Sequence, residues 1–203
     1  MQKRGVVISA INRKNESSAV KTYYQINVEL DTEDSMVANF INSCLEKISQ
    51  TFENEFKIYT GFSNDDQLEI IMSILSNHTP GCLVRAEVSC KIKDLESKEI
   101  TDSKLFANKF ITAVEIAENN ISRAVTHNKG IMNGIDSVVI ATGNDFRAVE
   151  ASAHSYASIT GKYTSLSHAY IVDDQFTFWM ELPLSIGTVG GITSIHPLVK
   201  WCL

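Results

Sequence analysis

Residues 82–92, CLVRAEVSCKI, alternate strictly between apolar and polar side chains. The apolar positions are Val84, Ala86, Val88, Cys90 and Ile92, and the polar positions are Arg85, Glu87, Ser89 and Lys91. A period of two predicts a β-strand with one polar face open to water and one apolar face that needs cover. We therefore expect a half-exposed strand in a lobe that combines strands with one long helix.

Other stretches show the spacing of helices. Between Ser35 and Glu53 the apolar residues recur every three to four positions, which predicts an amphipathic helix of about five turns. Residues 102–127 carry a second helical pattern. The Ala- and Ser-rich segment 144–160 predicts a third helix, closed by Gly161. A last helix is expected near the C-terminus, with Pro197 in its first turns.

Further runs rich in β-branched and aromatic residues predict additional strands at 5–9, 23–30, 67–75, 163–172 and 176–184. The last two flank a polar turn at Asp173-Asp174. The sequence thus predicts an α+β fold. We expect a small lobe with a mixed or antiparallel sheet in residues 1–100, followed by a helix-rich lobe with strands in residues 101–203.

Net charge, apolar runs and the spacing of cysteines and histidines exclude several classes of function. A net charge of −6 over 203 residues argues against a general nucleic-acid surface, which needs clustered Lys and Arg. No apolar run approaches the roughly 18–20 residues that span a bilayer, and the N-terminal apolar stretch is too short for a signal peptide. The four cysteines lack close pairing, which favours a reducing compartment and the cytoplasm. The five histidines lack zinc-site spacing, so no metal is expected.

Lys129 and Asp145 are the first candidates for chemistry. Lys129 lies among Asn128, Gly130 and Asn133, which allow close backbone approach and hydrogen bonding to a ligand. Asp145 follows an apolar, strand-like run, and its carboxylate could orient an ammonium group that stabilises an oxyanion. Without further information the plainer reading is favoured, in which the aspartate caps a helix and the lysine is solvated.

Three consecutive sequence blocks favour the chemical role over the purely structural one. THNKGIMNGID, VVIATGNDFRAVEASAHSYA and ELPLSIGTVGGITSIHPL resemble signature blocks of 3-hydroxy-3-methylglutaryl-CoA (HMG-CoA) reductase in its class II, bacterial form. Upstream, DTEDSMVANFINSCLE resembles the DAMGAN segment of that family, and ILSN resembles its asparagine-bearing substrate strand. The resemblance covers nearly the whole chain from about Gly5.

The resemblance implies a two-step reduction of the HMG-CoA thioester to mevalonate and CoA, with NADH or NADPH as hydride donor. It implies that Lys129 polarises the carbonyl and that Asp145 pairs with it. The implied substrate contacts are Arg123, Asn133 and Asn77. The implied cofactor contacts are Asp34, Met36, Asn39, Val189, Gly190 and Gly191. Residues 1–100 would then belong to the cofactor-binding lobe and residues 101–203 to the substrate-binding, catalytic lobe of a homodimer, with no membrane or nucleic-acid partner.

Two departures from the family pattern keep alternatives open. Ser35 and Val37 replace small residues of DAMGAN, and a β-branched side chain at 37 could crowd the nicotinamide. The family's catalytic glutamate and histidine have no counterpart in these residues. The chain is therefore expected to be a fragment or split form of the reductase, with two alternatives: an inactive remnant that binds a ligand, or a dimerisation module.

Overall fold

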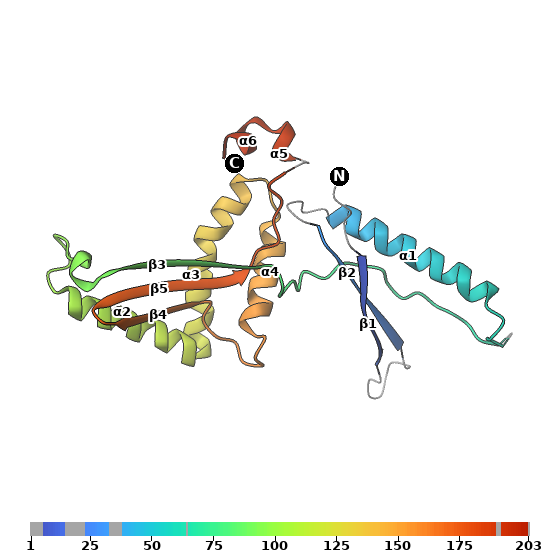
Figure 1. Ribbon diagram of the computed structural model, residues 1–203, viewed down its shortest axis with the longest axis horizontal. Coiled ribbons are helices and arrows are strands. Elements are labelled where there is room, and N and C mark those ends of the chain that lie inside the picture. The colour runs from blue at the N-terminus through green and yellow to red at the C-terminus, as the bar shows by residue number, and fades with distance from the viewer. Residues whose placement is uncertain (1–5, 15–22, 33–37, 64, 190–191, 203) are drawn as a thin grey trace. The chain divides into compact units, whose positions relative to one another are not determined.

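A computed structural model describes residues 6–14, 23–32, 38–63, 65–189 and 192–202 (Figure 1). Contacts divide the chain into two compact units, residues 1–76 and residues 77–203. The sequence analysis places this boundary near residue 100. The difference arises because the strand at 83–91 pairs along its whole length with the strand at 175–183, so it belongs with the second unit.

The first unit contains a two-stranded antiparallel sheet and one long helix. Strands β1 (Val6–Lys14) and β2 (Tyr23–Leu30) pair with a register shift at Ile8/Ala10. Helix α1 (Ala38–Ile58) confirms the helical spacing in this region and extends beyond the predicted end, whereas the first predicted residues, 35–37, lie outside the described residues.

The strand predicted at 67–75 is wrong, because these residues have no regular secondary structure. Instead of joining a sheet, the segment is bonded to side chains of α1. The Leu75 N–H donates to Asn42 Oδ1 at 3.0 Å, and the Ser49 and Ser73 hydroxyls are 2.5 Å apart. At Leu75 a side-chain acceptor on α1 thus takes the place of a strand partner.

The second unit contains a three-stranded antiparallel sheet in the order β3-β5-β4. Its strands are β3 (Leu83–Lys91), β4 (Ser167–Val172) and β5 (Gln175–Pro183). The β4–β5 hairpin turns at Asp173 and Asp174, whose φ angles are 47° and 64°. Positive φ at both central positions is the geometry of a two-residue hairpin turn, and aspartate tolerates it better than most residues. The predicted hairpin is confirmed.

The described part of this unit also contains six helical segments: η1 (Ile92–Leu95), α2 (Ser103–Asn119), α3 (Ile121–Ala141), α4 (Phe146–Ala157), α5 (Ile192–Ile195) and α6 (Pro197–Cys202). The single helix predicted at 102–127 is two helices, because Asn120 ends α2 and its side chain caps α3. The run DSVVIATG was expected to be strand-like, but most of it forms the end of α3.

Two further predicted helices differ from expectation: one ends earlier, and the other is divided in two. Helix α4 ends at Ala157 with Ser158 as its C-cap, and Gly161 (φ 88°) lies in the turn beyond. The expected last helix is divided into α5 and α6, and Pro197 opens α6, where its missing N–H removes no helical hydrogen bond.

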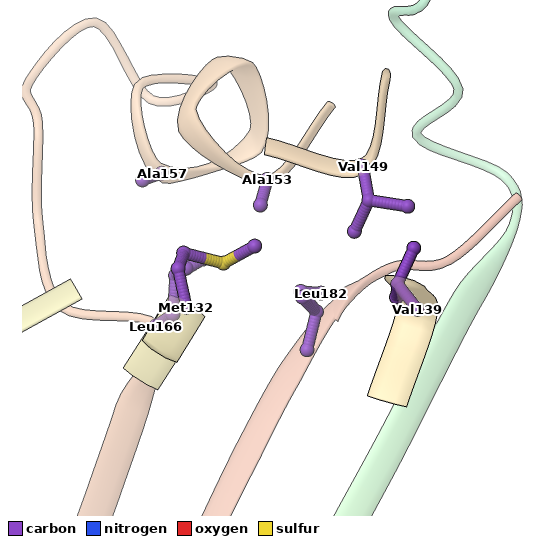
Figure 2. Packing of buried hydrophobic residues seen from close by; sticks show 7 residues of the cluster. All are labelled: Met132, Val139, Val149, Ala153, Ala157, Leu166 and Leu182. Atoms are coloured by element: carbon purple, nitrogen blue, oxygen red, sulfur yellow. The ribbon is translucent and has the colours of Figure 1, made fainter. Parts of the chain in front are cut away.

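The helices cover one face of the three-stranded sheet. In Figure 2, Met132 and Val139 of α3 and Val149 and Ala153 of α4 surround Leu182 of β5. A second cluster forms where the Phe110 ring of α2 meets Phe176 and Phe178 edge-on. These β5 residues alternate and so share one face.

Strand β3 is less covered than its alternation predicts. Helix α2 packs on β4 and α4 packs on β5, whereas Val84 and Val88 of β3 remain 46% and 64% exposed. Among the described residues, no helix is both long and apolar enough to cross a membrane.

Candidate functional site

Helix α3 carries three of the predicted site residues. Arg123, Lys129 and Asn133 are all exposed, while Ala124, Asn128, Met132 and Val139 are buried on the opposite side of the helix. This division follows from the helical period, which places residues three or four apart on one side. The exposed part of the helix surface therefore offers a guanidinium, an ammonium and an amide, with Lys129 and Asn133 one turn apart.

The same exposed side carries Gly130 and Gly134. A Cβ added at either glycine would meet nothing within 4 Å. Glycine inside a helix costs about 0.5–1 kcal/mol relative to alanine, and no packing within the unit requires it here. The open face beside Lys129 is consequently free for close approach by a ligand or another chain.

Asp145 is the N-cap of α4. Its Oδ1 accepts hydrogen bonds from the backbone N–H groups of Arg147 at 3.0 Å and Ala148 at 3.4 Å. Burial alone would raise the pKa of Asp145, but the N–H donors and the Arg147 guanidinium at 3.4 Å outweigh it and hold the pKa below its usual value. Asp145 is thus a stably ionised carboxylate at the start of a helix.

The expected ion pair between Lys129 and Asp145 is absent from the described residues. The Asn144 N–H donates to the Val139 carbonyl at 2.9 Å, which fixes the start of α4 near the end of α3. Val139 follows Lys129 by ten residues, about 15 Å along the helix axis. The sequence predicted a strand just before Asp145. The structure instead has one continuous helix that runs from Lys129 to Ala141 and separates the two groups.

Asn128 and His127 support the fold rather than reaching toward a ligand. Asn128 is fully buried, and its side chain donates to the Thr164 carbonyl at 2.9 Å and accepts from the Leu166 N–H at 3.0 Å. His127 Nε2 lies 2.7 Å from Ser167 Oγ; burial and the Arg123 charge lower the pKa of His127. The expectation that Asn128 hydrogen-bonds a ligand is therefore wrong.

Asn77 is exposed at the start of the second unit. The residues after it are held against α4: His78 is hydrogen-bonded to Ser155, and Thr79 Oγ1 lies 2.9 Å from the buried Ser152 Oγ. These contacts attach the segment that carries Asn77 to the helix that Asp145 begins.

Asn144 is a residue whose role the sequence did not indicate. Its Nδ2 donates to the Gly187 carbonyl at 3.1 Å, and its Oδ1 accepts from the Gly187 N–H at 2.8 Å. Gly187 precedes the predicted cofactor residue Val189, which is 56% exposed, by two positions. Asn144 therefore connects the Asp145 cap to the segment that leads to Val189. The only signal in the sequence was its place beside Asp145.

Most of the remaining candidate cofactor residues cannot be placed. Asp34, Met36, Gly190 and Gly191 lie outside the described residues. Asn39 is exposed at the second residue of α1, and its amide can donate and accept hydrogen bonds. Such an amide fits the carboxamide and hydroxyl groups of a nicotinamide nucleotide.

The family model for hydroxymethylglutaryl-coenzyme A reductase matches residues 3–202. The chain belongs to this family. It is 39% identical over 173 residues to a probable 3-hydroxy-3-methylglutaryl-coenzyme A reductase of Borreliella burgdorferi, covering 85% of this chain and 37% of that protein. It is 36% identical over 177 residues to the 3-hydroxy-3-methylglutaryl-coenzyme A reductase of Archaeoglobus fulgidus, covering 86% of this chain and 36% of that protein.

Solved structures of HMG-CoA reductases agree with the family assignment. The class II enzyme of Streptococcus pneumoniae bound to NADPH matches with a TM-score of 0.80 and 31% identity, over 98% of this chain and 45% of that chain. The resemblance to the class II form is thus confirmed, as is the α+β fold. The chain spans about 37% of the length of the curated relatives that it matches.

Proposed function

We propose that this chain forms part of an HMG-CoA reductase that uses NADH or NADPH to reduce the HMG-CoA thioester to mevalonate and CoA. The observation that carries the proposal is the family match across residues 3–202, which includes every predicted site residue. The NADPH-bound relative from Streptococcus pneumoniae supports the choice of a nicotinamide cofactor.

The exposed side of α3 suits recognition of the acyl group. The Arg123 guanidinium can pair with the free carboxylate of the hydroxymethylglutaryl group, and Asn133 can hydrogen-bond its polar oxygens. Lys129, four residues before Asn133, can stabilise the oxyanion that forms as the thioester carbonyl is reduced. Gly130 and Gly134 leave open space on the helix surface that the substrate could occupy. Asn77 adds a polar contact from the segment fixed on α4.

Asp145 has a separate position and therefore a separate task in this proposal. Its carboxylate is already held ionised by the start of α4, so it needs no lysine to remain charged. In the assembled enzyme it would supply the fixed negative charge that orients an ammonium or receives a proton. Its distance from Lys129 along this chain implies that the two groups meet only through substrate or through further protein.

The bound nicotinamide would supply the hydride. The nicotinamide contacts in this proposal are Asp34, Met36 and Asn39 in the first part of the chain, and Val189, Gly190 and Gly191 near its end. Asn144 would hold the segment that leads to Val189 through its two hydrogen bonds to Gly187. We place the protein in the cytoplasm as a homodimer; the four free cysteines are compatible with a reducing compartment.

The test is an assay of the purified 203-residue chain with HMG-CoA and each reduced nicotinamide, following loss of nicotinamide absorbance. Calorimetric titration with HMG-CoA in the same samples separates binding from turnover. Binding that is lost in Arg123→Ala but kept in Lys104→Ala, an exposed lysine on α2, supports the substrate site. Absence of both binding and turnover would contradict the proposal. Binding without turnover would support the substrate site, with turnover left to the assembled enzyme.

A further inference from the structure

Strand β4 forms one edge of the three-stranded sheet, and β5 is its one strand partner in the described part of the chain (Figure 1). Val172 and Gln175 pair directly across the two-residue turn. Just before the strand begins, the Leu166 carbonyl accepts from the Glu181 N–H at 3.1 Å. Hydrogen bonding in an antiparallel ladder alternates along each strand. The even-numbered residues of β4 therefore bond to β5, and the odd-numbered residues direct their backbone groups to the open edge.

Two residues at this open edge have backbone groups that bond to nothing else described. Ser167 is satisfied locally, because its N–H donates to Ser165 Oγ at 3.1 Å and its carbonyl accepts from the same hydroxyl at 2.8 Å. Ala169 and Ile171 have no such partner among the described residues. The sequence of β4, SHAYIV, also lacks the proline, acidic and basic residues that commonly protect an edge strand, whereas β3 at the other edge carries two cations and a carboxylate. The edge of β4 is therefore open to pairing.

A groove lies beside this edge, between β4 and α2. Its helical wall is a stripe of residues spaced three or four apart, Lys104, Asn108, Ile111 and Glu115, which we call the α2 stripe. The α2 stripe has a positive charge near one end and a negative charge near the other. An antiparallel copy of the same stripe would place Glu115 opposite Lys104 twice. The α2 stripe is thus complementary in charge to itself.

The α2 stripe and the open edge of β4 share one centre. The midpoint of the stripe is next to Phe110, whose ring meets Phe176 and Phe178 of β5 edge-on, with ring centroids 5.4 and 5.5 Å apart. These two β5 residues flank Thr177, which is the register partner of Tyr170. The midpoint is therefore level with Tyr170, which lies between the two unpaired residues of the strand. One two-fold axis through this point would satisfy the strand edge and the α2 stripe together.

We propose that β4 pairs antiparallel with β4 of a second copy of this chain, centred on Tyr170, to form a continuous six-stranded sheet. Ala169 of each copy would exchange two hydrogen bonds with Ile171 of the partner subunit. Tyr170, which is 42% exposed, would pack against its counterpart on the face away from α2. The homodimer itself rests on the proposed function, whereas this interface follows from β4 and α2.

The two α2 helices would pack at an ordinary distance across this interface. Helix α2 lies over the boundary between β4 and β5, because one hydrophobic cluster joins Ala107 to Phe176 of β5 and to Ile171 of β4. Neighbouring strands lie about 4.8 Å apart, so two helices placed half a spacing inside the paired edges would be about 10 Å apart. Packed helices have axes about 8–10 Å apart. Lys104 would then face Glu115 of the partner subunit.

The first test is sedimentation velocity of the 203-residue chain over a range of concentrations. We expect a dimer whose Kd rises by about tenfold or more in Lys104→Glu and in Glu115→Lys, because each change places like charges opposite one another twice. The double variant Lys104→Glu/Glu115→Lys exchanges the charges and should return the Kd to within about threefold of the unaltered value. Lys109→Glu makes the same charge change on another side of α2, and as the matched control it should leave the Kd unchanged.

The second test is amide hydrogen exchange, which reports the strand pairing without any substitution. The Ala169 and Ile171 amides should exchange more slowly as the chain concentration rises through the Kd. The Tyr170 amide bonds to β5 in the monomer and the dimer, so its exchange should change less.

Three results would overturn the proposal: a chain that stays monomeric, a dimer that neither single charge reversal weakens, or a dimer in which the Ala169 and Ile171 amides gain no protection. A monomer would leave the edge of β4 to a different partner, such as the rest of a longer reductase. Neither test uses substrate or cofactor. An inactive chain could therefore still confirm this interface, and an active monomer would refute it while leaving the reductase proposal in place.

Discussion

Asn144 and Gly187 exchange two hydrogen bonds, one in each direction, between the start of α4 and the segment that follows β5. The Asn144 backbone N–H is also bonded to the Val139 carbonyl of α3. A single residue therefore connects the α3–α4 turn to the chain that leads to Val189. This places the helix cap at Asp145 and the predicted cofactor segment in one connected structure.

Asn144→Ala should destabilise the second unit. The change removes the Asn144 amide and leaves the Gly187 N–H and carbonyl unpaired, which should cost about 1–3 kcal/mol of unfolding free energy. Urea unfolding of the two proteins measures the difference. Asn108→Ala, at an exposed position of α2, is the matched control and should change stability by less than about 0.5 kcal/mol. Equal losses in the two variants would show that the amide pair contributes nothing specific.

Gly130→Ala and Gly134→Ala should stabilise the chain. Both glycines are exposed inside α3 with open space around an added Cβ, so each alanine should add about 0.5–1 kcal/mol to the unfolding free energy. If the open face receives substrate, HMG-CoA binding should weaken in the same variants. Thermal unfolding and calorimetric titration give the two readouts. Higher stability with unchanged binding would remove this face from the site.

The elements predicted best from sequence are those with a long, clear period. Helix α1 and the β4–β5 hairpin fit their patterns because a sustained stripe or an Asp-Asp turn specifies local geometry by itself. The strand prediction for 67–75 was wrong because short apolar runs suit several conformations, and here the Leu75 N–H donates to the Asn42 side chain instead of to a neighbouring strand. The end of α3 failed for a related reason. Its β-branched VVI favours a strand locally, yet Val139 packs against α4.

The sequence named the candidate site residues, whose roles stay predictions, but it did not predict how Lys129 and Asp145 are arranged. Sequence blocks indicated Lys129 and Asp145 as a pair, yet their separation depends on whether residues 131–141 are helix or strand, which tertiary packing decides. The structural roles of Asn128 and Asn144 could not be predicted for the same reason. An asparagine that bonds to distant backbone has no local pattern, since Thr164 and Gly187 lie 36 and 43 residues away.

Lys129→Ala should abolish thioester reduction in a reductase that contains this region, while its fold is retained. The side chain is exposed and has no ion pair with Asp145, so its removal should change the unfolding free energy by less than about 0.5 kcal/mol. Loss of the oxyanion-stabilising charge should lower kcat by roughly 100-fold or more. Lys109→Ala, at an exposed position on α2, is the matched control. Undiminished turnover in Lys129→Ala would refute the catalytic assignment.

Two substitutions at Asp145 separate its structural role from its proposed chemical one. Asp145→Ala removes the cap of α4 and should cost about 0.5–2 kcal/mol near neutral pH, whereas Asp145→Asn keeps a good cap and should cost little. Because hydrogen bonding lowers the pKa of Asp145, its stabilisation is present above the unfolded value of 3.8 and is lost as the pH falls through the folded value. The stability gap between Asp145→Ala and the unaltered chain should therefore shrink in acid.

Activity measures the proposed chemical role of Asp145 separately from its capping role. If the carboxylate charge takes part in the reaction, Asp145→Asn should lose turnover although it folds as stably as the unaltered chain. Denaturant unfolding over a range of pH, combined with the nicotinamide assay in an intact reductase, measures both properties. Full activity in Asp145→Asn would leave Asp145 with the capping role alone, and Lys129 would then act without this carboxylate.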